Sequence, residues 1–106
     1  MKKGSKAELL MQKMLHADME VSQKKYFCEI LMYDMEQECI YLVLEDDLLS
    51  TVSLDAIFEC KIKDAEEGQI CCTGRVKERY IDENGQILKF KIENGFYKIN
   101  IKSVDK

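Results

Sequence analysis

The sequence predicts a mainly β protein, a small six-stranded antiparallel barrel with an N-terminal helix. Three observations support this prediction. Apolar and polar residues alternate with a period of two along most of the chain after residue 24. Turn signals that contain glycine separate these runs at roughly ten-residue spacing. The 106 residues amount to one domain, and closing the sheet into a barrel leaves no strand edge exposed.

The helix and a connection are predicted for residues 1–23, ahead of a β-barrel domain over residues 24–106. Ser5 and Glu8 have the spacing of a capping box, in which each side chain accepts a hydrogen bond from a backbone N–H of the first helical turn. The apolar residues that follow recur at three- and four-residue spacing: Ala7, Leu10, Met11, Met14 and Leu15. We therefore expect a helix over the first 18 residues.

Six strands are predicted after the helix. Residues 26–33 and 39–44 are β-prone runs that are apolar on both faces, which favours burial on both sides for the second run. The remaining runs alternate more cleanly, at residues 57–63, 69–81, 87–93 and 96–104. In the 69–81 strand, one face is predicted to carry Ile70, Cys72, Gly74, Val76 and Tyr80.

Several segments between the strands carry turn signals. Asn84-Gly85 and Asn94-Gly95 are typical of hairpins, and residues 64–68 are expected to form a turn. Gly74 lies inside a predicted strand and indicates a bulge or a close backbone approach. The segment Leu48–Leu54 fits either a short strand or a loop with one turn of helix.

Composition argues against several classes of function. The net charge of −4 makes nucleic-acid binding unlikely by bulk attraction, and no apolar run is long enough to cross a bilayer, so a cytoplasmic protein is expected. The five cysteines lack Cys-x-x-Cys spacing and are predicted to be buried thiols in a reducing compartment. We predict no metal site and no cofactor.

An enzyme is not expected. His16 is the only histidine, and it sits near the end of the predicted helix, a poor place for an ordered general base. Carboxylates gather at residues 45–47 and 82–83, but these segments resemble solvated turns rather than an acid–base pair. No catalytic residue is therefore predicted.

Basic residues of the second half share the outward side of their predicted strands. If these strands form consecutive hairpins, one sheet face becomes a basic stripe. The candidate ligand-binding residues are Arg75, Lys77, Arg79, Lys89 and Lys91. A solvated β face, on which lysine is ordinary, is the competing interpretation.

The strand pattern, with the segment Thr73–Arg79 and the hairpin after it, resembles PilZ-type domains, including the N-terminal barrel of flagellar-brake proteins. The resemblance covers residues 24–104. It implies a six-stranded barrel and, in members with complete motifs, binding of cyclic di-GMP through an Arg-x-x-x-Arg segment and an Asp-x-Ser-x-x-Gly segment. Here Arg75 and Arg79 match the first motif only inside a predicted strand, and the second motif is absent.

The function predicted from the sequence is thus a non-enzymatic PilZ-like interaction or regulatory module. Its expected partner is a protein or a second copy of itself, and cyclic di-GMP stays open as a ligand although its usual motifs are absent. The alternative is a small barrel that binds a nucleotide or RNA through the basic strand face.

Overall fold

A computed structural model describes residues 3–14, 24–64 and 68–98. Six strands and one short 3₁₀ helix make up this part of the chain. Their bounds are β1 (Lys6–Met14), β2 (Lys25–Asp34), β3 (Cys39–Leu44), η1 (Leu49–Thr51), β4 (Ala56–Asp64), β5 (Gly68–Asp82) and β6 (Gly85–Lys98). The 3₁₀ turn confirms the second of the two expectations for residues 48–54, a loop with one turn of helix.

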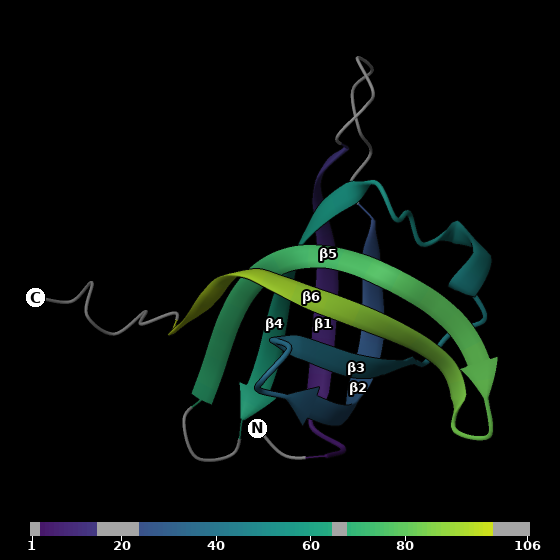
Figure 1. The fold of residues 1–106 in the computed structure, drawn as a ribbon, viewed down its shortest axis with the longest axis horizontal. Helices are drawn as coiled ribbons and strands as arrows, with labels where there is room; N and C mark the ends of the chain where they lie inside the picture. Colours follow the sequence, from purple (N-terminus) through teal and green to yellow (C-terminus); the bar gives the residue numbers. More distant parts are fainter. Residues whose placement is uncertain (1–2, 15–23, 65–67, 99–106) are drawn as a thin grey trace, which may run out of the picture.

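The strands close into a barrel in the order β1-β2-β3-β6-β5-β4, and every neighbouring pair is antiparallel. This confirms the predicted closed six-stranded architecture. The long β5–β6 ribbon arches across β1, β2 and β4, which cross it at a steep angle (Figure 1). Because each strand has two neighbours, the closed sheet satisfies most backbone donors and acceptors internally.

The N-terminal helix predicted for the first 18 residues is wrong for residues 6–14, which form β1. Ala7, Leu9 and Met11 point into the barrel and are almost fully buried. Leu10, which lies between them, is also apolar, so the same residues fit the spacing of an apolar stripe on a helix. Strand pairing determines that these residues form a strand. β1 is hydrogen-bonded to β2 on one side and to β4 on the other, which closes the barrel. Residues 15–18 of the expected helix lie outside the described residues.

The hairpin expected at Asn94-Gly95 is also wrong, because β6 runs through this position without a break. Gly95 does not have the positive φ that a tight hairpin turn requires. The Asn94 side chain instead donates to the Thr73 hydroxyl of β5, at 3.0 Å. The hairpin at Asn84-Gly85 is confirmed, and Gly85 has a φ of 115°.

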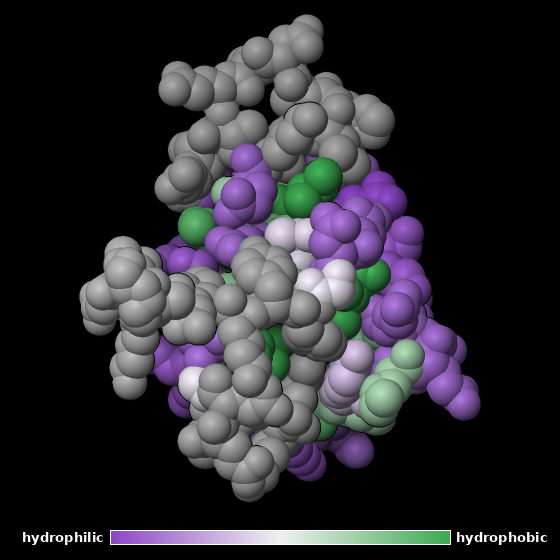
Figure 2. Space-filling model, turned by 90° about the vertical axis from the view of Figure 1, so that its left-hand side faces the viewer, coloured by the Kyte–Doolittle hydropathy of each residue, from purple (hydrophilic) through white to green (hydrophobic). Residues whose placement is uncertain are grey.

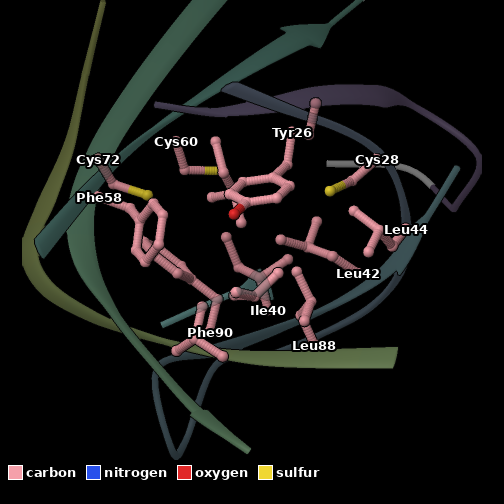
Figure 3. Packing of buried hydrophobic residues seen from close by; sticks show 14 of the residues in the cluster. Tyr26, Cys28, Ile40, Leu42, Leu44, Phe58, Cys60, Cys72, Leu88 and Phe90 are labelled. Carbon is pink, nitrogen blue, oxygen red and sulfur yellow. The ribbon is translucent and has the colours of Figure 1, made fainter. Parts of the chain in front are cut away.

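The barrel interior is filled by apolar side chains from all six strands (Figure 3). Phe58 and Phe90 are the largest fully buried side chains among them. Among the described residues, no polar or charged side chain is buried. All five cysteines are free and buried, as the sequence predicted. Burying these side chains is the main stabilising contribution to the fold.

The interior thiols sit among these apolar residues, with Cys60 of β4 directly opposite Cys72 of β5. Burial raises the pKa of the Cys28 thiol to about 12, and the nearby Glu45 carboxylate acts in the same direction. The pKa of Cys60 is raised well above its usual value by its side-chain hydrogen bond with Cys72 and by burial. These thiols are therefore protonated at neutral pH, and buried thiols of this kind are chemically inert.

Gly74 confirms the prediction of a close backbone approach inside a strand. A Cβ atom at this position would lie 1.9 Å from the Lys91 carbonyl oxygen of β6. The pairing of β5 with β6 shifts on both sides of Thr73, next to this glycine. No side chain fits here, so the contact between the two long strands depends on glycine.

The segment around η1 lies at one end of the barrel and is held by three strands. The Tyr26 hydroxyl of β2 donates to the Thr51 carbonyl at 3.0 Å. Gln86 of β6 accepts from the Leu49 amide and donates to the Asp46 carbonyl. The Arg79 guanidinium of β5 donates to the Ser50 and Val52 carbonyls.

Candidate interaction face

The outer side of β3, β6 and β5 carries the predicted basic residues together with aromatic ones. We call this surface, together with Met32 of the neighbouring β2, the tyrosine face; its other residues are Tyr41, Val43, Lys77, Glu78, Tyr80, Lys89 and Lys91. Tyr41 lies directly across from Lys89, and Lys89 across from Glu78. Strands far apart in sequence thus bring these side chains side by side.

A bulge in β5 determines which residues reach this face. Val76 pairs with Phe90 and Glu78 pairs with the adjacent Lys89, so Lys77 is an extra, exposed residue. The bulge reverses the alternation of side chains after Val76. Arg79 is therefore opposite Leu88, a residue of the interior, while Tyr80 is opposite Ile87.

The predicted alternation of β5 is consequently wrong beyond Val76. Tyr80 was expected to point inward and instead lies on the outer face, paired with Ile87 and through it with Val43. Ile87 is fully buried although it does not belong to the interior cluster. Val43, Ile87 and Tyr80 therefore form a small apolar layer on the outside of β3, β6 and β5.

Three of the five candidate ligand-binding residues meet in one shallow depression. Lys77, Lys89 and Lys91 line it, together with Gln37, Cys39 and Glu78. Lys91 Nζ is 2.6 Å from the Gln37 carbonyl oxygen and 3.8 Å from a Glu38 carboxylate oxygen. Lys89 Nζ is 4.0 Å from a Glu78 carboxylate oxygen and 5.9 Å from the centre of the Tyr41 ring. Two of the three ammonium groups are thus already paired within the chain.

The structure does not bring the two arginines together. Arg75 is on the outer side of β5, and its Nε donates to Glu93 of β6 at 2.6 Å. Arg79 is turned to the end of the barrel, where it binds carbonyl groups around η1. The predicted continuous basic stripe is therefore divided between a shallow depression, an ion pair and a structural contact.

Two groups of the tyrosine face have raised pKa values. The Tyr41 side chain raises the pKa of the neighbouring Lys89 ammonium, which stays charged at neutral pH. Partial burial raises the pKa of the Tyr80 phenol, with a further contribution from Asp82. The face thus offers the neutral Tyr80 hydroxyl beside a positive charge, and tyrosine is enriched in interfaces because it combines an apolar ring with a polar end.

The aromatic residues of this face were not predicted from the sequence. Tyr41 belongs to a run that is apolar throughout, and nothing in that run indicates which side points outward. Met32 of β2 lies directly across from Tyr41 and is 50% exposed, so the apolar area continues onto a fourth strand. The alternating burial of Ile40, Leu42 and Leu44 is the signal that identifies the side on which Tyr41 lies.

Within the described ranges 3–14, 24–64 and 68–98, no group of three or more His, Cys, Asp or Glu residues is arranged to hold a metal ion. No helix among the same residues is long and apolar enough to span a membrane. The side of the molecule in Figure 2 shows hydrophobic residues reaching the surface among hydrophilic ones.

In comparisons with known proteins, no family model, no curated protein and no solved structure matches the chain.

Proposed function

We propose that this protein is a non-enzymatic PilZ-like interaction or regulatory module that binds a protein partner, or a second copy of itself, through the tyrosine face. The closed six-stranded antiparallel barrel is the fold that the resemblance implies, and this supports the proposal. Since apolar side chains fill the interior, recognition takes place on an outer surface. The five free thiols support a reducing compartment, the cytoplasm.

One observation carries the proposal: Met32, Tyr41 and Lys89 lie in one row across three strands, with Glu78 at its end. Tyrosine and methionine are enriched in protein interfaces, where they supply large contact areas. Lys89 and Glu78 continue the row, and their pairing with each other favours contacts with a protein over contacts with a polyanion.

Cyclic di-GMP is not the ligand in this proposal. Arg75 and Arg79 spell the family's arginine motif, yet Arg75 is bound to Glu93 and Arg79 to carbonyls at the barrel end. Neither guanidinium is placed to clamp a guanine with the other. Calorimetric titration with micromolar cyclic di-GMP is expected to give no saturable heat, and saturable binding would contradict this part of the proposal.

Site-specific photo-crosslinking tests the interaction face. A photo-reactive amino acid replaces Met32 or Lys77 on the face, or Asp47 in an exposed loop as the control. The expected result is a discrete adduct, to another protein or to a second copy, from the two face positions only. Excess unlabelled wild-type protein should suppress this adduct, and a Tyr41→Asp competitor should not. Equal adducts from Asp47, or suppression by the Tyr41→Asp competitor, would overturn the proposal.

Binding of a nucleotide or RNA is the second candidate, and one observation favours it. Lys77 is exposed beside Lys89 and Lys91, and it has no ion-pair partner among the described residues. Phosphate contacts of this kind weaken steeply as salt rises. Affinity for a short single-stranded RNA, measured at several salt concentrations, is expected to be weak. Tight, salt-sensitive binding that Lys77→Met reduces would favour this candidate instead.

A further inference from the structure

A second hollow lies on the opposite side of the barrel, over β1 and its neighbours. It measures about 210 Å³ and is lined by Lys6, Ala7, Glu8, Phe27, Cys28, Glu45, Lys61, Lys63 and Gln69. Glu8 of β1 is directly across from Lys61 of β4 on one side and Phe27 of β2 on the other. The site thus combines residues of three strands with Gln69 at the start of β5, and none of them belongs to the tyrosine face.

The carboxylates around the hollow are paired with cations of the same chain. Lys6 Nζ is 2.7 Å from a Glu29 oxygen and 2.8 Å from a Glu45 oxygen. These two hydrogen bonds raise the pKa of Lys6, which remains a cation. Glu8 is paired with Lys25 at 3.5 Å. Two cations thus offset three carboxylates, and one negative charge remains for other cations to balance.

Two lysines of β4 make the surroundings of the hollow net positive, with four cations against three carboxylates. Lys61 and Lys63 both line the hollow, and neither has an ion-pair partner within the described part of the chain. They are two residues apart on one strand, so their side chains emerge on the same side. Gln69 is directly across from Lys63 and brings an amide to the same end of the hollow.

Phe27 gives the hollow a flat apolar wall. Its side chain points outward and is 44% exposed, so packing in the barrel interior does not account for its identity. Lys25 Nζ lies 5.9 Å from the ring centre, a distance typical of a cation–π contact. An aromatic ring with this neighbouring pair of lysines is suited to a ligand that has a flat apolar part and an anionic group.

We infer that this hollow binds a small organic anion with an aromatic ring, whose phosphate or carboxylate contacts Lys61 and Lys63 and whose ring lies against Phe27. The inference does not depend on the tyrosine face, which is separate from it in the barrel. Binding is non-covalent and requires no metal.

A titration of ¹⁵N-labelled protein followed by NMR tests the inference. Phenyl phosphate and benzoate are the probes, and either is expected to shift the amide signals of Glu8, Phe27 and Lys61 with saturation. The probe that binds more tightly identifies the anionic group. Inorganic phosphate supplies the charge without the ring, and benzyl alcohol the ring without the charge. Both are expected to bind at least about tenfold more weakly.

Variants test whether the named side chains bind the probes that shift the amide signals. Lys61→Met and Lys63→Met each remove a charge but retain much of the side-chain length, and each is expected to weaken phenyl phosphate binding about fivefold. Phe27→Leu should weaken it by a similar factor. Lys77→Met, a lysine of the tyrosine face, is the matched control and should have no effect. No saturable shift with either probe, or equal weakening by Lys77→Met, would overturn the inference.

Discussion

The two outer surfaces of the barrel carry similar numbers of lysines but use them differently. On the tyrosine face, Lys89 and Lys91 are close to Glu78 and Glu38, and Lys89 also lies over the Tyr41 ring. On the β1 side, the carboxylates are paired with Lys6 and Lys25, and Lys61 and Lys63 have no ion-pair partner among the described residues. The comparison teaches that a basic residue has to be judged by its partners across strands rather than by its position in one strand.

The two sides also differ in the regularity of their strand pairing. β4 and β5 pair without a shift from Phe58 to Asp64, whereas the β5–β6 pairing shifts three times. Each irregularity changes which side chains point outward. The tyrosine face therefore results from bulges, and the β1 hollow results from regular alternation. The predictions below test this difference, beginning with the largest effect.

Gly74→Ala is expected to destabilise the protein most, because the new Cβ would lie 1.9 Å from the Lys91 carbonyl oxygen and would force β5 and β6 apart. We expect a loss of about 3 kcal/mol or more in the free energy of unfolding, measured in urea. Gly95→Ala is the control in the same ribbon, since no atom lies within 4 Å of its built Cβ. Equal losses in both variants would contradict the close approach.

Arg79→Met tests the assignment of Arg79 to the barrel end. Removing the guanidinium leaves the Val52 and Ser50 carbonyls without this donor, which should cost about 2 kcal/mol. Arg75→Met breaks only the partly exposed ion pair with Glu93, and a loss below about 1 kcal/mol is expected. Urea unfolding of both variants provides the measurement. A larger loss for Arg75→Met would mean that the two arginines have the opposite roles.

Alkaline pH should weaken the fold through its interior thiols. The pKa of Cys28 is about 12 in the folded protein, against 9.0 for an ordinary thiol. Between these values the unfolded chain binds fewer protons than the folded one, so stability falls as pH rises from 9 toward 12. Each pH unit well inside this window should cost about 1.4 kcal/mol from Cys28 alone.

Urea unfolding at several pH values, with Cys28→Ala as the comparison, measures this effect. The variant should lose less stability per pH unit than the wild type. The same slope in both proteins would show that the Cys28 thiol is not buried as the structure has it.

The smallest effects are expected from the exposed apolar residues of the two surfaces. Phe27→Leu and Met32→Gln should each change the free energy of unfolding by less than about 0.5 kcal/mol, because both side chains are about half exposed. Thermal unfolding of both variants checks this expectation. A large loss from either one would show that its surface serves the fold rather than a ligand.

The sequence was sufficient for much of the barrel. Alternation in β4 correctly placed Phe58, Cys60 and Ile62 inside, and the Asn84-Gly85 signal located the hairpin between the two long strands. The prediction from sequence failed at β1, because the apolar Leu10 made these residues fit a helical stripe as well as a strand. The long-range pairing of β1 with β2 and β4 decides between them, and this pairing leaves no mark in the local sequence.

The candidate site was only partly predictable for a related reason. Lys77, Lys89 and Lys91 were expected together and do line one depression. Arg79 and Tyr80 were assigned to the wrong sides because one extra residue in β5 reverses the alternation after it. Tyr41 was missed because an entirely apolar run has no polar side from which to determine its orientation.

The orientation of Arg79 and Tyr80 is therefore the central claim, and NMR of the side chains tests it most directly. The account predicts nuclear Overhauser effects between the Tyr80 ring and the Ile87 and Val43 methyl groups, and between Arg79 and the Val52 methyl groups. Effects between the Tyr80 ring and Leu88 or Phe90, with Arg79 in contact with Lys89, would show that β5 has no bulge at Lys77. The outer face would then be a continuous basic stripe, and the account of the tyrosine face would be wrong.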